Sequence, residues 1–166
     1  MIVTILRHGE AGAAAVDAER ELTPAGIDDI SFGSHHFRDV CGLRGLPAPE
    51  LILHSAWLRT TETADILARL FPQAQVQADA ALLPSGRIAG VTQMLSLLEK
   101  SKTPSHVVLV SHQPLVSDLV DFYIGLPHSA PPLPPGGLVT VSMDVPAQSC
   151  AKLLFWAVPP EYEAGM

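Results

Sequence analysis

Short apolar runs rich in β-branched residues recur along the chain, and a segment with helical spacing of apolar positions follows each of the first four. These four runs are Ile2–Leu6, Leu51–His54, Gln75–Gln77 and Val107–Val110. Alternating strands and helices are typical of a parallel sheet that carries helices on its faces. The pattern therefore predicts an α/β protein with a mostly parallel central sheet.

Four helices are expected between and after these strands. The first begins after Thr23, a residue suited to cap a helix N-terminus, with Pro24 at the first helical position. Its apolar stripe comprises Ile27, Ile30, Phe37 and Cys41, and Gly42 is expected to end it. The other helices are expected from about Trp57 to Phe71, from Ile88 to Glu99 and from Pro114 to Gly125.

The C-terminal part carries two further apolar runs, Leu138–Met143 and Leu153–Val158, with no long helix between them. They are expected to pair as antiparallel strands at the edge of the sheet. The expected fold is thus a three-layer α/β structure with helices on both faces, in a single domain spanning residues 1–166. We interpret the proline-rich segment Pro127–Gly137 as a stiff loop, with a proline-rich ligand motif as the weaker alternative.

Charge and composition narrow the function classes. Ten basic and seventeen acidic residues give a formal net charge of −7, which would repel nucleic acid and anionic membrane surfaces. No stretch approaches the length of a membrane span, and the start lacks the pattern of a signal peptide. The two cysteines, Cys41 and Cys150, are too few for a disulfide framework. A cytoplasmic protein is expected.

Basic and imidazole side chains follow three of the predicted strands. Arg7 and His8 follow the first strand, Arg59 lies just after the second, and His112 follows the run that ends at Val110. Because the carboxyl ends of parallel strands meet at one edge of the sheet, these side chains are expected to converge. Two guanidinium groups and two imidazoles around one pocket are suited to grip a phosphoryl group.

The segments that carry these residues occur in the order L-R-H-G-E-A, L-T-P-A-G, S-x-x-x-R-T-x-x-T-A and V-S-H-Q-P. This order resembles the histidine phosphatase superfamily, formerly called phosphoglycerate mutase-like, and the resemblance covers the chain from about Met1 to Gly125. It implies that His8 is a nucleophile that takes up the phosphoryl group. It also implies a phosphate-binding set made of Arg7, Gly9, Arg59 and His112.

The two site histidines are expected to have opposite tasks. An imidazole attacks phosphorus only through an unprotonated nitrogen, so His8 should be neutral, with its other ring nitrogen donating to a carbonyl. His112 should donate to the bound anion, which favours its protonated form, so the two should titrate apart. The other histidines lack metal-ligand spacing, and neither a metal nor another cofactor is expected. They are His35, His36, His54, His106 and His128.

The spacing of the motifs bears on the substrate. Little more than one helix and one strand separates His8 from Arg59, and the same holds between Arg59 and His112, so no cap insertion is expected. An uncovered site would admit a phosphorylated side chain of another protein. This compactness, with the L-L-P-S-G segment at Leu82–Gly86, resembles the SixA-type branch, whose substrates are phosphohistidines of signalling domains. The implied function is that of a phosphohistidine phosphatase.

The source of the leaving-group proton stays open. Many phosphomonoesterases of the superfamily have a glutamate after the third strand, whereas Gln73–Gly90 contains one carboxylate, Asp79. A site without a strong acid suits phosphohistidine, because a protonated imidazole leaves readily. Glu10 is the other candidate acid, or else a structural carboxylate. Two alternatives also remain: a broad small-molecule or phosphoserine/phosphothreonine phosphatase, and a catalytically silent phosphate-binding module.

Overall fold

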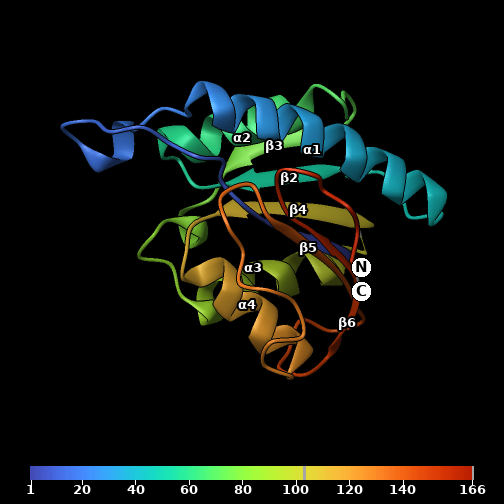
Figure 1. Ribbon diagram of the computed structural model, residues 1–166. Coiled ribbons are helices and arrows are strands. Elements are labelled where there is room, and N and C mark those ends of the chain that lie inside the picture. Colours follow the sequence, from blue (N-terminus) through green and yellow to red (C-terminus); the bar gives the residue numbers. More distant parts are fainter. Residues whose placement is uncertain (103, 166) are drawn as a thin grey trace.

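Six strands form one mixed sheet in the computed structural model, which describes residues 1–102 and 104–165. They are β1 (Ile2–Arg7), β2 (Leu51–His54), β3 (Gln75–Ala78), β4 (His106–Ser111), β5 (Leu138–Met143) and β6 (Ala151–Ala157). Their order is β3-β2-β4-β1-β5-β6 (Figure 1). β1 to β4 are parallel to one another, β5 pairs antiparallel with β1, and β6 pairs antiparallel with β5. The predicted fold class is confirmed, including the antiparallel C-terminal edge.

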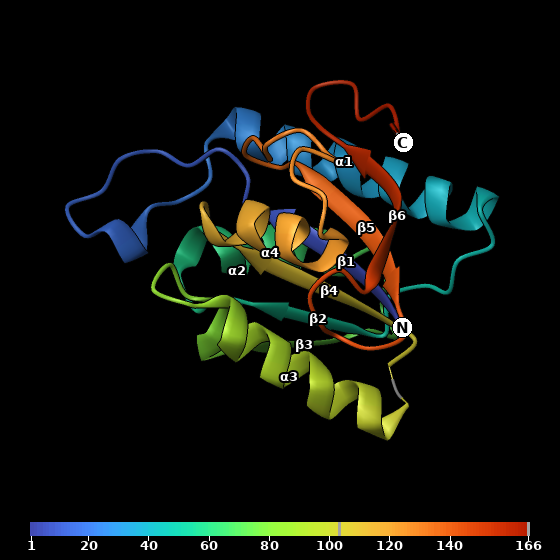
Figure 2. The ribbon, with the colours of Figure 1, turned by 90° about the horizontal axis from the view of Figure 1, so that it is seen from below.

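Helices cover both faces of this sheet. α1 (Pro24–Leu43) and α2 (Leu58–Ala68) lie on one face, and α3 (Ile88–Ser101) and α4 (Leu115–Ile124) on the other (Figures 1 and 2). Two single turns complete the fold: η1 (Asp17–Glu19), and η2 (Ala80–Leu82), whose Leu82 is fully buried in the apolar cluster beneath α3 and α4. Within the described residues, no helix combines the length and apolar character that a membrane crossing requires.

The central strand β4 shows why the sheet is sandwiched in this way. Val107 and Leu109 belong to the apolar cluster beneath α3 and α4, while Val108 and Val110 belong to the cluster beneath α1 and α2. All four side chains are fully buried. Each such burial contributes about 1.5–3 kcal/mol, so a strand that is apolar on both faces is stable only between two helical layers.

The start of α1 follows the sequence prediction, whereas its buried face and its end differ. Thr23 caps the helix by accepting a hydrogen bond from the Gly26 N–H at 3.0 Å. Ile27, which was expected in the buried stripe, is 40% exposed, because the buried face begins one residue earlier, at Gly26. The helix runs past Gly42 to Leu43, and Gly45 takes up the left-handed backbone conformation.

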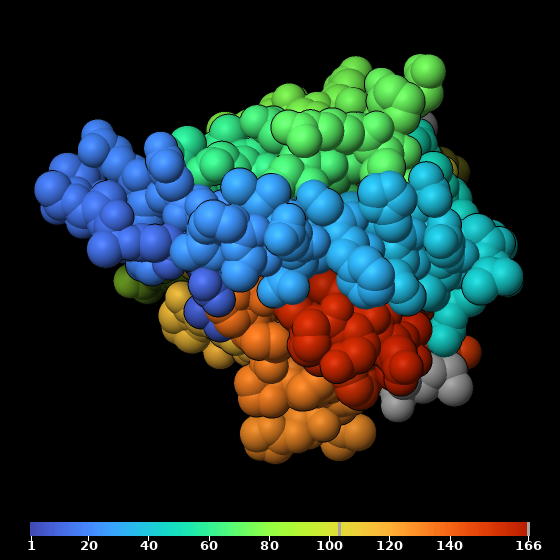
Figure 3. Space-filling model, turned by 45° about the horizontal axis from the view of Figure 1, so that its top comes forward, coloured from blue at the N-terminus to red at the C-terminus, as the bar shows by residue number. Residues whose placement is uncertain are grey.

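The connection between β1 and α1 projects from the body of the molecule (Figures 1 and 3). We call residues 11–21 the arm. Arg20 ties its two sides together, since Nε donates to the Gly12 carbonyl at 2.7 Å and Nη2 to the Ala11 carbonyl at 3.3 Å. The arm returns to the body through the bridge between Ala11 and Leu22. It is a braced projection beside the carboxyl end of β1.

Candidate active site

The strand ends that carry the predicted site residues are neighbours in the sheet. β4 lies between β2 and β1, and Arg7 at the end of β1 is in register with Ser111 at the end of β4. The His8 N–H extends this pairing by donating to the Ser111 carbonyl at 3.1 Å. Side chains that follow these strands therefore meet at one edge, as the sequence predicts.

His8 is held as a single tautomer. Its Nδ1 lies 2.7 Å from the Gly9 carbonyl oxygen, and since a carbonyl only accepts, Nδ1 carries the hydrogen. Nε2 therefore carries no hydrogen, and its lone pair accepts a hydrogen bond from Arg59 Nε at 3.2 Å. The unprotonated nitrogen therefore points at the guanidinium group, in the arrangement that a nitrogen nucleophile needs.

The surroundings of His8 also keep its ring uncharged. Burial, together with the positive charges of Arg59, Arg7 and Arg20, lowers the pKa of His8 to about 4. The hydrogen bond to the Gly9 carbonyl opposes this effect without reversing it. The imidazole is thus neutral near pH 7, and it is also 7% exposed, so a reactant can reach it.

His112 lies beside His8, and its ring nitrogens form no hydrogen bond with the described residues. The two ring centroids are 5.3 Å apart, and the ring planes make an angle of 58°. Within the described part of the chain, neither ring nitrogen of His112 has a hydrogen-bond partner, although the residue is 2% exposed. One of these nitrogens carries a hydrogen in any tautomer, so His112 presents a buried donor that an anion could accept.

The pKa of His112 is lowered in the free site. Burial, with the neighbouring His8 and Arg59 acting in the same direction, lowers it to about 3. Both site histidines are therefore neutral near pH 7 in the free site. The expected separation of their titrations depends on a bound anion and stays a prediction. The negative charge of Asp17 raises the pKa of His112 but does not offset the burial, whereas a bound dianion would raise this pKa further.

Arg59, on the first turn of α2, lies between His8 and the arm. Besides His8, its guanidinium group contacts the arm, where Nη1 donates to the Asp17 carbonyl at 2.8 Å and lies 3.4 Å from Oδ1 of the Asp17 carboxylate. The group also stacks over the Trp57 ring, 4.8 Å from its centroid. Trp57 in turn packs edge-to-face on His112, with centroids 5.3 Å apart. The sequence interpretation missed both Asp17 and Trp57.

Arg7 is fixed from the opposite side by the proline-rich loop. Its Nη1 donates to the Leu133 carbonyl at 3.0 Å, and Gln113 Nε2 donates to the same carbonyl at 2.9 Å. Nε of Arg7 is buried without a partner among the described residues. Burial and the nearby charge of Arg59 lower the pKa of Arg7. Two repelling guanidinium groups around neutral imidazoles form a site that a phosphoryl anion would neutralise.

Gly9 has a different role from the phosphate contact that the resemblance implies. Its N–H already donates to Thr63 Oγ1 at 3.0 Å, so no backbone donor of Gly9 is free. A Cβ at this position would lie 2.8 Å from Cγ1 of Ile30, so glycine is needed for close packing against α1. The Thr63 hydroxyl also donates to the Arg59 carbonyl at 2.7 Å, which joins two of the motifs.

The two candidate acids both have structural partners. The Glu10 carboxylate is exposed and accepts a hydrogen bond from Thr23 Oγ1 at 3.0 Å, at the start of α1. Asp79 accepts from the Ala81 N–H at 2.8 Å and caps η2. Neither carboxylate is hydrogen-bonded to His8, Arg59 or His112 among the interactions of the described residues.

Two of the other histidines are satisfied core residues. His106 is fully buried, with Nδ1 donating to the Pro47 carbonyl at 2.8 Å and Nε2 lying 2.9 Å from Thr4 Oγ1. His54 donates to the Ser55 carbonyl at 2.8 Å. In residues 1–102 and 104–165, no three histidine, cysteine or acidic side chains gather as a metal site would require.

Solved structures with the same fold cover nearly the whole chain. A protein histidine phosphatase SixA solved with tungstate has 25% identity and a TM-score of 0.78, over 96% of this chain and 97% of that one. A putative phosphohistidine phosphatase SixA from Agrobacterium tumefaciens has 27% identity and a TM-score of 0.74, over 95% and 98%. No family model matches the sequence, and no curated protein matches it.

More distant relatives of the fold act on other substrates. A phosphoserine phosphatase from Entamoeba histolytica, solved as a mutant with phosphoserine, has 16% identity and a TM-score of 0.65, over 93% of this chain and 95% of that one. At that identity the likeness shows the fold alone. Together the comparisons confirm the resemblance to the histidine phosphatase superfamily and to its SixA-type members.

Proposed function

Because this chain is a phosphatase of the histidine phosphatase type, we propose that it is a phosphohistidine phosphatase and that His8 is its nucleophile. The observation that carries the proposal is the meeting of His8, His112 and Arg59 at one edge of the sheet. The lone pair of His8 Nε2 faces Arg59, and His112 presents an unpaired donor beside it. Arg7 supplies the second cation.

The first chemical step transfers the phosphoryl group to the enzyme. The lone pair of His8 Nε2 forms a bond to phosphorus while the bond between phosphorus and the substrate nitrogen breaks, and its electrons stay on the leaving nitrogen. Arg59 Nε, which donates to His8 Nε2 in the free site, would turn to the phosphoryl oxygens. Arg7 and His112 would stabilise the charge on the equatorial oxygens.

The second step regenerates the free enzyme. A water molecule attacks phosphorus, the bond to His8 Nε2 breaks with its electrons returning to Nε2, and inorganic phosphate leaves as H2PO4− with both protons of the water. Between the two steps the ring of phosphorylated His8 bears positive charge, and the hydrogen bond from Nδ1 to the Gly9 carbonyl would stabilise it. Gly9 therefore contributes its carbonyl oxygen rather than its N–H.

The choice of a phosphohistidine substrate rests on the leaving group. Glu10 and Asp79 both have structural hydrogen-bond partners. The Asp17 carboxylate lies 3.4 Å from Arg59 Nη1, but the hydrogen bond from Arg20 lowers the pKa of Asp17, so this carboxylate is a weak source of a proton for an alkoxide. The imidazole of a protonated phosphohistidine leaves without further proton transfer. The likeness to SixA structures supports the same choice.

The proposed partner is a phosphorylated protein in the cytoplasm, such as a signalling domain that carries phosphohistidine. We propose one domain without a cap, because little more than the arm, which includes η1, and α1 separates β1 from β2. An uncovered site leaves room for a side chain displayed on another protein. The net charge of −7 disfavours nucleic acid as a partner.

Rates on three substrates decide between the proposal and its main rival. A phosphohistidine protein, a phosphoserine peptide and p-nitrophenyl phosphate would be compared at one pH, with His8→Ala as the inactive control. We expect the phosphohistidine protein to have the highest kcat/KM. Faster hydrolysis of the two esters would favour a broad-specificity phosphatase, with Glu10 or Asp79 as its acid. Binding without turnover by the wild type would favour a silent phosphate-binding module.

A further inference from the structure

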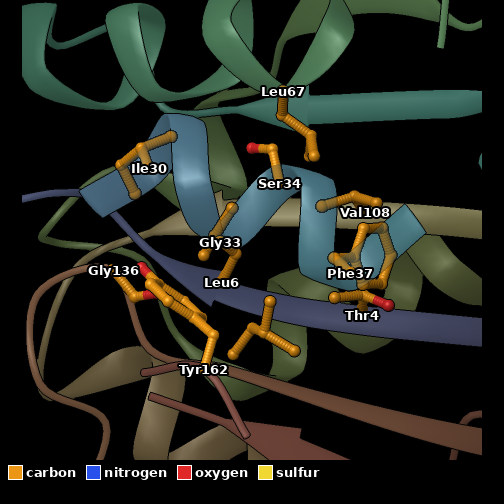
Figure 4. Close-up of a pocket in the computed structure, with 11 residues that line it drawn as sticks. Thr4, Leu6, Ile30, Gly33, Ser34, Phe37, Leu67, Val108, Gly136 and Tyr162 are labelled. Atoms are coloured by element: carbon orange, nitrogen blue, oxygen red, sulfur yellow. The ribbon is translucent and has the colours of Figure 1, made fainter. Parts of the chain in front are cut away.

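The chain continues past β6 and folds back against the sheet, which brings its last tyrosine under α1. Gly165 pairs with Trp156 of β6, through hydrogen bonds of 3.0 and 2.8 Å between their backbones. Tyr162 lies in the turn that this pairing closes, and it is 1% exposed. Figure 4 shows its side chain running between α1 and the loop around Gly136.

Two glycines form the slot that the Tyr162 side chain occupies. A Cβ at Gly33 of α1 would lie 2.4 Å from Cζ of Tyr162, and a Cβ at Gly136 would lie 2.6 Å from its hydroxyl oxygen. The cavity left among these residues has a volume of about 10 Å³, which holds at most one water molecule (Figure 4). The space beneath α1 is therefore a packed slot for the tyrosine and not a ligand site.

The hydroxyl group of Tyr162 connects this slot to the nucleophile. It donates to the Gly136 carbonyl at 2.9 Å. The N–H of the same Gly136 donates to the His8 carbonyl at 2.9 Å and lies 3.2 Å from the Arg7 carbonyl. Gly136 has a φ of 80°, a backbone conformation that glycine adopts without strain but that nothing within the residue itself enforces. The Tyr162 hydroxyl supplies an external restraint at that point.

We propose that Tyr162 is a positioning residue which, through Gly136, holds the backbone of Arg7 and His8 in the geometry needed for phosphoryl transfer. The inference rests on the proposed role of His8 as the nucleophile. It assigns the C-terminal tail, 154 residues away in sequence, to the support of the site. Small displacements of a nucleophile reduce rates strongly, so one hydrogen bond at this distance has a measurable effect.

The two tyrosines of the chain provide a matched test. Tyr123 is also fully buried, and its hydroxyl lies 2.8 Å from Thr92 Oγ1, between α3 and α4 on the other face of the sheet. Tyr162→Phe and Tyr123→Phe each remove one oxygen and one hydrogen bond, which is buried for Tyr162 and partly buried for Tyr123. We expect both variants to lose comparable stability in urea. Only Tyr162→Phe should lower the rate of phosphoenzyme formation, on the order of tenfold, with little change in KM.

An NMR titration measures the pKa of the His8 ring, which would stay unchanged if Tyr162 only stabilised the fold. The charged and titratable groups around His8 are Arg7 on β1, Arg20 on the arm, Arg59 on α2 and His112 after β4. A looser turn admits water to the ring, so the pKa of His8 should rise from about 4 toward its ordinary value in Tyr162→Phe and stay unchanged in Tyr123→Phe.

Gly33→Ala provides a second variant that keeps the hydroxyl group. The added methyl group displaces the tyrosine ring from the side of α1, and it should slow phosphoryl transfer in the same way. If Tyr162→Phe and Gly33→Ala matched Tyr123→Phe in both rate and His8 titration, the inference would be overturned. If the wild type itself formed no phosphoenzyme, the proposed function would fail, and the NMR titration would still decide the role of Tyr162.

Discussion

His8 owes its reactivity to atoms outside its own side chain. The Gly9 carbonyl sets the tautomer, Arg59 faces the lone pair, and burial keeps the ring neutral. The unpaired nitrogens of His112 and the buried Nε of Arg7 surround the same place. Each of these residues alone is ordinary. Their combination yields a neutral nucleophile beside donors that have no acceptor in the protein, which is the requirement for binding and attacking a phosphoryl group.

Removing the Arg59 side chain tests whether its guanidinium group acts on the phosphoryl group. Arg59→Ala removes the donor nearest to the lone pair of His8, and we expect a loss on the order of 10²–10³ in kcat/KM, as for a single oxyanion donor. Arg7→Ala should lose a similar factor. Arg69→Ala is the control, because Arg69 is an exposed arginine next to the end of the same helix.

Steady-state kinetics on the preferred substrate measure these losses. Wild-type kcat/KM in Arg59→Ala would contradict the role given to this guanidinium group. A loss of equal size in Arg69→Ala would show that the effect comes from the general charge of α2 and not from contact with the phosphoryl group.

The site residues that could be predicted from the sequence follow strand ends, whereas those that were missed depend on the path of a loop or the position of a helix. Arg7, His8, Arg59 and His112 follow strand ends, and strand ends can be predicted from apolar runs. Asp17 lies on the arm, where nothing in the sequence fixes the path of the chain. Trp57 could have been noticed, since it lies two residues before Arg59, but its contact with His112 depends on the position of α2 relative to β4. Sequence spacing does not contain that information.

Among the elements, the start of α1 contributes most to the shape of the site. Glu10 follows the nucleophile segment, and both its carbonyl and its carboxylate accept hydrogen bonds from Thr23, the cap of α1. Gly26 on the first turn approaches so closely that a Cβ there would lie 2.3 Å from the Glu10 carbonyl oxygen. The start of the helix is therefore hydrogen-bonded to, and closely packed against, the segment after β1.

A pair of glycine variants in α1 tests this coupling. Gly26→Ala forces the helix away from Glu10, so we expect a loss of about 1–3 kcal/mol in the free energy of unfolding together with a lower kcat. Gly42→Ala, near the other end of the helix, meets no atom within 4 Å and should stabilise the protein by about 0.5–1 kcal/mol with unchanged kcat. Urea unfolding and steady-state rates measure both. An unchanged kcat in a destabilised Gly26→Ala would separate α1 from the site.

The positions of helices and strands along the chain were predicted more accurately than the face that each element buries in the core. β2 and β5 have the predicted limits, and each of the four helices is present close to its expected range. The face of α1 was misjudged at Ile27, because apolar character alone cannot show that Gly26 makes the closest contact. Strand order could not be derived either, since the pairing of β5 with β1 depends on the whole sheet.

For the whole molecule, buried histidines set the dependence of stability on pH. Burial lowers the pKa of His8 and of His106 to about 4 and that of His112 to about 3. The unfolded chain takes up protons on these residues near pH 6.5, whereas the folded protein does not until much lower pH. Their contribution to stability is therefore complete above pH 6.5 and declines as the pH falls toward 4 and 3.

Urea unfolding at a series of pH values measures this effect. Within the window each neutral buried histidine contributes a slope of about 1.4 kcal/mol per pH unit, and the three slopes add. His106→Gln should reduce the slope by one histidine and leave the catalytic rate intact, since His106 lies at the opposite end of β4 from His112. A free energy of unfolding that stays constant from pH 7 to about 5 would contradict the burial of these rings as neutral groups.

The phosphoenzyme itself tests the central claim most directly. The protein would be mixed with a phosphohistidine substrate, quenched in base within milliseconds, and digested for mass spectrometry under alkaline conditions that preserve phosphorus–nitrogen bonds. We predict one phosphoryl group on His8, stable in base and lost in acid, with none formed by His8→Ala. Phosphate on any other residue, or turnover by His8→Ala at the wild-type rate, would contradict the assignment of His8 as the nucleophile.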